Sequence, residues 1–192
     1  MFQNFEIALA GAPDVASILQ VQDGNLIKLS PENIERLKDG SRGFLIHALF
    51  GDELSDLVSD TKDNLVLVSR CNGQVCGYAL AYDLTKWKRL NPAWERDVEV
   101  DGAEKEILNM GKIMYLRHIA RRDGFDRCGS SIMRALLEKA RASSYDAVVA
   151  EILQAPVVNA VSTEFHEFHG FYRIGSVREG QEMRWGLFMK KL

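Results

Sequence analysis

A strand, a glycine-containing turn, an amphipathic helix and a second strand follow one another between residues 112 and 154. The flanking runs KIMYLRHIA (112–120) and YDAVVAEILQ (145–154) are apolar and rich in β-forming residues. The helix between them has an apolar face made of Ile132, Met133, Leu136, Leu137 and Ala140. Because a strand–helix–strand crossover joins parallel strands of one sheet, this segment predicts a parallel pair covered by a helix.

Hairpins before and after this unit predict antiparallel neighbours. The runs NLVLVSR (64–70) and VCGYALAYD (75–83) are joined through Asn72 and Gly73, a dipeptide that supplies the positive φ angles of a type I′ turn. Residues 171–192 contain FYRIGSV and EMRWGLFMKKL, which we interpret as a closing strand pair. The expected fold class is therefore α/β (α+β), with a mixed, mostly antiparallel sheet.

The first sixty residues predict a strand followed by helices. FEIALA (5–10) alternates briefly like a strand, and residues 12–25 carry apolar positions at helical spacing. SPENIERLKDG (30–40) begins with Ser-Pro-Glu and ends in glycine, which are start and stop signals of a helix. FLIHALFGDELSDLVSD (44–60) has a mixed period, and we expect it to be helical.

The stretch from Leu84 to Gly111 has no sustained period and predicts a long loop. It contains Trp87, Trp94 and a group of acidic residues: Asp97, Glu99, Asp101, Glu104 and Glu106. Charged runs are usually solvated surfaces. If this loop instead closes over a binding cleft, acids beside aromatic rings would suit a cationic amine.

Composition limits the class of protein. The chain has 192 residues, 46% of them hydrophobic, so we expect one domain spanning residues 1–192. Its formal net charge is −3, which argues against a nucleic-acid partner and requires any anion to be bound locally. No run is long and apolar enough for a membrane span or a signal peptide, so we expect no membrane partner.

Three cysteines, Cys71, Cys76 and Cys128, form an odd and sparse set. This pattern predicts reduced thiols in a cytoplasmic protein rather than a disulfide framework. No metal is expected, because the cysteines lack a second close ligand pair and the four histidines are scattered.

The start of the helix at residue 128 has the chemistry of an anion site. Cys128, Gly129, Ser130 and Ser131 have small side chains, and their backbone N–H groups lack intrahelical acceptors. These groups and the helix dipole favour a negative charge, and Arg127 beside them has a forked donor set suited to phosphate. A pyrophosphate is the expected guest; the alternative is that the glycine and serines only cap the helix.

Two segments, IARRDGFDRCGSSIMRALLEKA and NAVSTEFHEFHGFYRIGS, together resemble the signature segments of the GNAT N-acetyltransferase superfamily. The first resembles the family's strand, glycine loop and helix, with Gly129 at the last glycine. Gly124 stands where the family has Arg or Gln, and Arg127 where it has Gly. The second contains Asn159 and a Gly170-Phe171 pair. The order of elements resembles the family over essentially all 192 residues.

The resemblance implies acetyl-coenzyme A (acetyl-CoA) as co-substrate. It also implies a splayed V between the fourth and fifth strands of the sheet, with helices on both faces and the pantetheine running beside the fourth strand. The positions that would bind the cofactor are His118, Ile119, Gly124, Phe125, Asp126, Arg127, Cys128, Gly129, Ser130, Ser131, Asn159 and Phe165.

Acetyl transfer needs a neutral amine, a polarised carbonyl and a proton for the leaving thiolate. His166 occupies the place of the family's tyrosine acid, and Tyr115 that of a common glutamate base. Glu151 lies among aliphatic neighbours and is the better candidate for a base, because burial raises a carboxyl pKa. The alternatives are a packing role for His166 and a Glu151–Arg117 ion pair.

We therefore expect an N-acetyltransferase that acts on a small-molecule amine by direct attack in a ternary complex. The alternative is a coenzyme A-binding module that has lost catalysis, because the glycine loop, the tyrosine and the strand glutamate all depart from the family pattern. The terminal strands could supply edges for a homodimer. The sequence does not specify the amine.

Overall fold

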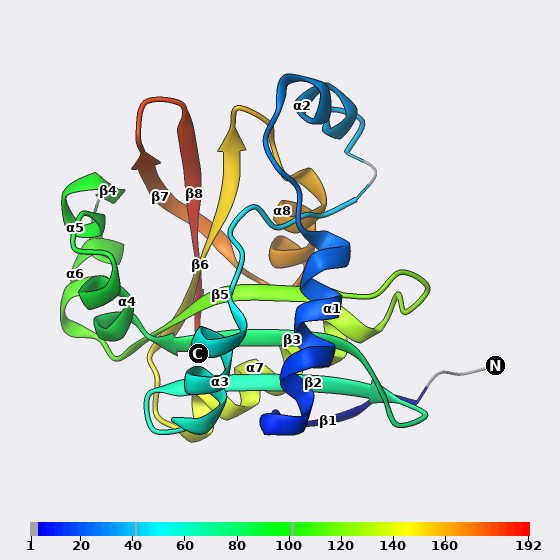
Figure 1. The fold of residues 1–192 in the computed structure, drawn as a ribbon. Helices are drawn as coiled ribbons and strands as arrows, with labels where there is room; N and C mark the ends of the chain where they lie inside the picture. Colours follow the sequence, from blue (N-terminus) through cyan, green and yellow to red (C-terminus); the bar gives the residue numbers. More distant parts are fainter. Residues whose placement is uncertain (1–3, 41, 101) are drawn as a thin grey trace.

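The computed structural model describes residues 4–40, 42–100 and 102–192. Its centre is one eight-stranded sheet with the order β1-β2-β3-β5-β6-β8-β7-β4 (Figure 1). The strands are β1 (Glu6–Leu9), β2 (Asn64–Cys71), β3 (Gln74–Asp83), β4 (Val98–Val100), β5 (Ile113–Arg121), β6 (Ala147–Ala155), β7 (Tyr172–Glu179) and β8 (Met183–Lys191). Only β5 and β6 are parallel, so the predicted mixed, mostly antiparallel sheet is confirmed.

Helices lie on both faces of the sheet, as predicted. In Figure 1, α1 crosses the front of β2, β3 and β5, α3 lies in front of β2, and α7 lies behind these strands. The helical segments are η1 (Ala12–Asp14), α1 (Val15–Asn25), α2 (Pro31–Leu37), α3 (Gly51–Ser59), α4 (Leu84–Leu90), α5 (Trp94–Asp97), α6 (Ala103–Met110), α7 (Cys128–Ala142) and α8 (Ala160–Phe168). None of these helices is long and apolar enough to cross a membrane, within the described part of the chain.

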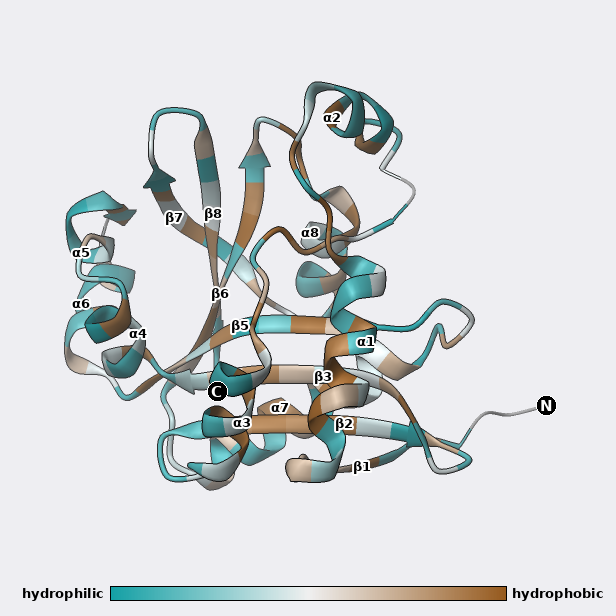
Figure 2. Ribbon diagram, in the orientation of Figure 1, coloured by the Kyte–Doolittle hydropathy of each residue, from teal (hydrophilic) through white to brown (hydrophobic). Residues whose placement is uncertain are grey.

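Alternation along the central strands divides the core into two layers. In β5, the side chains of Ile113 and Tyr115 belong to the layer beneath α1 and α3, and those of Met114 and Leu116 to the layer beneath α7. The predicted apolar face of α7 fills the second layer, and Leu136 is fully buried there. Burial of one such side chain contributes about 1.5–3 kcal/mol. Figure 2 shows the resulting apolar colouring of the central strands.

The parallel pair separates after four residues of each strand. Pairing joins Ile113–Leu116 to residues 147–150, and the last pair is Leu116 with Ala150. Beyond it, β5 continues against β3 and β6 continues against β8. Figure 1 shows β6 rising away from β5. The predicted V is therefore present between the fourth and fifth strands in sheet order.

Local signals explain two elements. Asn72 and Gly73 have φ angles of 52° and 77°, as the type I′ turn requires. Ser30 accepts a hydrogen bond from the backbone N–H of Asn33 at 3.3 Å, and Pro31 opens α2. These turn and cap residues act through short-range geometry, which is why the sequence predicts them.

The expectation of one helix over 44–60 is wrong in its first half. Residues 43–50 form no helix, and we call them the strap; α3 begins only at Gly51. The Leu45 N–H donates to the carbonyl of Asn25, and Gln22 makes two side-chain hydrogen bonds to the backbone of Leu49. These partners replace the intrahelical hydrogen bonds that the apolar run would otherwise form.

The predicted loop from Leu84 to Gly111 is also wrong. The segment folds into α4, α5, β4 and α6. Asp83 caps α4 by accepting from the Thr85 N–H at 2.8 Å, and Trp94 is buried. Helices this short depend on tertiary packing, so no sustained period marks them in the sequence.

The terminal strands do not offer the free edges expected for a dimer. β8 lies between β6 and β7, and β4 pairs with Gly175–Val177 of β7. The strands at the two edges of the sheet are β1 and β4. The reason for expecting pairing between copies through the last two strands is thereby removed.

Candidate active site

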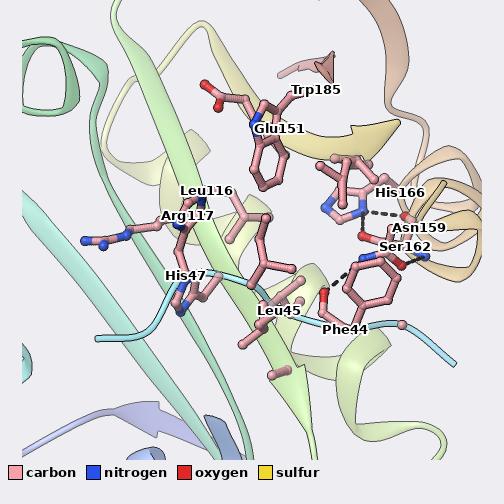
Figure 3. A pocket seen from close by; sticks show the side chains of 18 of the residues that line it. Phe44, Leu45, His47, Leu116, Arg117, Glu151, Asn159, Ser162, His166 and Trp185 are labelled. Carbon is pink, nitrogen blue, oxygen red and sulfur yellow. Dashed lines mark hydrogen bonds between the residues drawn. The ribbon is translucent and has the colours of Figure 1, made fainter. Parts of the chain in front are cut away.

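A cavity of about 1060 Å³ passes between the separated parts of β5 and β6. One end reaches Gly129 and Ser130 at the start of α7, and the other reaches Trp87 and Trp94. The strap also lines it, with Phe44, Leu45 and His47 (Figure 3). The cavity thus joins the predicted anion site to the predicted base, Glu151, which also lines it.

The start of α7 offers two free backbone donors rather than four. The Cys128 N–H donates to the carbonyl of Phe125, and the Ser131 N–H donates to that of Arg127. The N–H groups of Gly129 and Ser130 have no acceptor among the described residues. Both point from the positive end of the 15-residue helix, where an anion is favoured.

A second hollow adjoins this helix end and is basic. It is lined by Arg127, Arg134 and His169, together with the exposed ring of Phe168.

Of the other residues predicted at the loop, Gly124 has a φ of +83°, Asp126 pairs with Arg121 at 3.1 Å, and Phe125 packs against the α7 layer.

Cys128 is buried and does not face the cavity. Its Sγ lies 3.4 Å from that of Cys76, and burial raises the pKa of the Cys128 thiol to about 12. A thiol that stays protonated is a poor nucleophile. Cys128 is therefore not placed to act as a nucleophile in the cavity.

The separated part of β5 leaves one backbone edge facing the gap. His118 and Ile119 pair with β3 on the other side, and both line the cavity. The His118 ring is buried, its Nδ1 lies 3.1 Å from the Tyr78 hydroxyl, and burial lowers its pKa to about 3. The ring belongs to the core, so the backbone is the part that can meet a ligand.

Asn159 connects α8 to the strap. Its Oδ1 caps the helix by accepting from the Ser162 N–H at 3.3 Å, and its Nδ2 donates to the Phe44 carbonyl at 2.9 Å. Both polar atoms of the Asn159 side chain are therefore already engaged in hydrogen bonds within the protein. Phe165, on the same helix, packs near Gly129: a Cβ on that glycine would lie 3.5 Å from the Phe165 ring.

His166 is a buried, neutral imidazole. Its Nδ1 lies 2.7 Å from the Ser162 carbonyl, which can only accept, so Nδ1 carries the hydrogen and Nε2 has a free lone pair. Nε2 has no partner within the described residues. Figure 3 shows it turned toward the gap, and burial lowers the pKa of His166 to about 4. The ring can accept a hydrogen bond at neutral pH but does not carry a positive charge.

Glu151 is the first residue of β6 beyond the last pair with β5, so it lies at the apex of the V. Its Oε1 accepts from the Trp94 indole N–H at 2.5 Å. Burial raises the pKa of Glu151 to about 7. The alternative ion pair with Arg117 is contradicted, because Arg117 pairs with Glu53 at 2.7 Å.

Aromatic rings surround this carboxyl. Tyr115 is buried beside Glu151 and stacks on Trp87 with ring centroids 4.6 Å apart. Burial raises the pKa of Tyr115 well above its ordinary value, so the phenol stays neutral. Trp87 and Trp94 come from the segment expected to be a loop. These two tryptophans are the feature of the sequence that indicated an aromatic lining near Glu151.

The acidic residues of that segment do not supply the unpaired charges that a cationic acceptor would need. Asp97 and Glu99 each pair with an arginine, and Glu104 pairs with Lys191. Glu106 is exposed, and Asp101 lies outside the described residues.

A contact that sequence reasoning missed lies at this end of the cavity. His47 of the strap lies 3.3 Å from Glu179 and stacks on the ring of Trp185. The Trp185 indole N–H also donates to Glu179, at 2.9 Å. We call His47, Glu179 and Trp185 the clasp. His47 and Glu179 are 132 positions apart, so no local pattern indicates the contact.

No protein-family model matches the sequence, and no curated protein matches it either. Solved structures do share the fold. PaiA N-acetyltransferase from Thermoplasma acidophilum, in complex with coenzyme A, is 11% identical, with 98% of this chain and 99% of that chain covered and a TM-score of 0.61. The ribosomal-protein-S18-alanine N-acetyltransferase of Escherichia coli is 9% identical, covers 98% and 94%, and has a TM-score of 0.64.

An acetyltransferase of the GNAT family from Streptococcus pneumoniae is 15% identical, with 98% and 100% coverage and a TM-score of 0.57. The chain therefore has the fold of the GNAT acetyltransferases over nearly its whole length.

Across residues 4–40, 42–100 and 102–192, no group of three metal-ligating side chains could hold a metal ion.

Proposed function

We propose that this protein is an acetyl-CoA-dependent N-acetyltransferase of the GNAT superfamily that acetylates a small-molecule amine by direct attack. The observation that carries the proposal is Glu151, a carboxyl with a pKa of about 7 at the apex of the V. A base with this pKa is half ionised near neutral pH, where proton removal from an amine is useful. A fold that holds coenzyme A in PaiA supplies the donor.

The cofactor would lie along the cavity from α7 to Glu151. Its pyrophosphate would accept from the N–H groups of Gly129 and Ser130, with Arg127 adding positive charge. The basic hollow containing Arg134 and Phe168 would receive the phosphorylated adenosine. The pantetheine would run beside the free edge of β5 at Ile119. When bound, acetyl-CoA supplies an activated acetyl thioester.

The residues at the apex prepare the amine. Glu151 takes a proton from the ammonium, which leaves a neutral nitrogen able to attack the thioester carbonyl. The Trp94 N–H fixes the carboxyl, and the neutral Tyr115 phenol lies beside it. His166, on α8, lines the same cavity as a neutral ring, and its unpartnered Nε2 is itself buried.

The clasp favours a small acceptor over a polypeptide. It joins the strap to the β7–β8 hairpin through the His47–Glu179 contact and the His47–Trp185 stack. A polypeptide acceptor would meet both contacts on this side of the cavity.

The free cysteines support a cytoplasmic location, because Cys76 and Cys128 lie side by side unbonded.

One observation favours a second candidate, a coenzyme A-binding module without catalysis. With a pKa of about 4, His166 has no proton to give to a leaving thiolate at neutral pH. Both candidates predict cofactor binding, and only the transferase predicts turnover.

Calorimetric titration with acetyl-CoA, together with free-thiol release in the presence of a pool of small amines, tests the proposal. Binding with amine-dependent thiol release is the expected result. Binding without thiol release from any amine in the pool would favour the inactive module, and absence of binding would contradict both candidates.

A further inference from the structure

We propose that the acceptor is a compact amine with a second positive charge, whose reacting nitrogen lies at Glu151 and whose second cationic group lies at Glu179. This inference rests on the proposed function and names the substrate class for the same site. It is carried by the charges and the aromatic walls of the acceptor end of the cavity.

The arginines at this end are already neutralised. Each has its own carboxylate within 2.8 Å: Arg96 with Asp97, Arg117 with Glu53, and Arg178 with Glu99. Glu151 has no cationic partner among the described residues, since its hydrogen bond comes from the uncharged Trp94 indole. Once these ion pairs are set aside, the remaining charge at the acceptor end of the cavity is negative.

Glu179 is the second carboxylate without a permanent cation. Its Oε2 meets the Trp185 N–H and the His47 imidazole, while its Oε1 has no partner within the described residues. The hydrogen bond from His47 holds the pKa of Glu179 below its ordinary value, so the group stays ionised. The side chain is 45% exposed and lines the cavity, which makes Oε1 accessible to a ligand.

The walls between the two carboxyls are aromatic. Trp87 and Tyr115 form a parallel stack, and Trp94 and Trp185 line the same end. Aromatic faces attract ammonium groups and also shield an aliphatic chain from water. A molecule with cationic ends and an apolar middle matches this surface better than an anionic amine, which Glu179 would repel.

The strap is held against β6 on one side of the cavity. Leu37 and Phe44 pack with Leu153 and Val157 in a separate apolar cluster that ties α2 and the strap to β6. Glu151 and Glu179 line the same cavity of about 1060 Å³, which has room for a small diamine.

The test compares three amines of equal length with saturating acetyl-CoA: putrescine, pentylamine and aminobutanol. Only putrescine has a second positive charge. We expect its kcat/KM to exceed those of the other two by about fivefold or more at low salt, with the advantage falling at high salt. Glu179→Gln keeps the size of the side chain and should lower kcat/KM for putrescine toward that of pentylamine.

Glu182→Gln is the matched control, because Glu182 is an exposed carboxylate of the same hairpin that does not line the cavity. It should keep the preference for putrescine. Equal kcat/KM for all three amines, or a preference that survives Glu179→Gln, would overturn the diamine inference while leaving the acetyltransferase intact. No turnover with any of the three, while another amine of the pool releases thiol, would overturn the inference alone; no turnover with any amine, despite acetyl-CoA binding, would remove the inference and the transferase together.

Discussion

The two ends of the cavity are built in different ways. The anion site at the proposed cofactor end is made of backbone donors and small side chains within one short segment, Cys128–Ser131, at the start of a single helix. The proposed acceptor end consists of side chains from the strap, the segment after β3, β6 and the β7–β8 hairpin. The anion site would bind a constant group through local geometry, whereas the acceptor end would change its specificity through side-chain replacement alone.

This difference explains how much the sequence could predict. The α7 start and the hairpin turn follow from local periodicity and turn chemistry, whereas the V was expected only from the resemblance to the GNAT superfamily. The clasp was not predictable, because His47 meets Glu179 only after the whole sheet has formed. Glu151 was found because a carboxylate in an apolar strand run requires an explanation, but its partner, Trp94, comes from a segment without periodicity.

The largest effect is expected at the cofactor end, from Gly129→Asp. A Cβ at this position would make only ordinary contact, 3.5 Å from the Phe165 ring, and a carboxylate in the first helical turn favours the helix. The fold should therefore persist while acetyl-CoA affinity falls by about a hundredfold or more, because the new charge occupies the anion site. Calorimetry measures this, with Gly129→Ala as a control that should bind normally. Wild-type affinity in the aspartate variant would contradict the anion site.

At the acceptor end, Glu151→Gln should increase stability at alkaline pH. The folded-state pKa is about 7 and the ordinary value 4.5, so the folded protein retains a proton that the unfolded chain has lost between these values. Wild-type stability therefore falls as pH rises through this window. The variant should be more stable by about 2–3 kcal/mol at pH 8 and nearly unchanged at pH 4. Chemical denaturation at both pH values checks this; an equal difference at the two would contradict the raised pKa.

The link between the two ends is Asn159, which holds the strap to α8. Asn159→Ala removes the α8 cap and the donor to the Phe44 carbonyl, and should lower the free energy of unfolding by about 1–2 kcal/mol. The control is Asn33→Ala, since the exposed Asn33 amide also donates to a backbone carbonyl. Thermal melts of the two variants should differ. Equal melting temperatures would show that the strap is held without Asn159.

The smallest effect is expected for His166→Asn. The asparagine amide can still donate to the Ser162 carbonyl, but the acceptor at Nε2 is lost. Because the pKa of His166 is about 4, the ring does not titrate above pH 6. We expect a turnover loss of about three- to tenfold and an unchanged shape of the pH–rate profile. If the variant loses a limb of the profile between pH 6 and 9, His166 exchanges a proton in the reaction.

The most direct test of the acetyltransferase account is the pH dependence of kcat/KM for wild type and Glu151→Gln at saturating acetyl-CoA, with an amine that wild type acetylates. The account predicts an inflection near pH 7 in wild type, with activity rising as Glu151 loses its proton. The variant should lack that inflection and be slower by about a hundredfold or more, with acetyl-CoA affinity unchanged. A variant that keeps both the rate and the inflection would show that Glu151 is not the base.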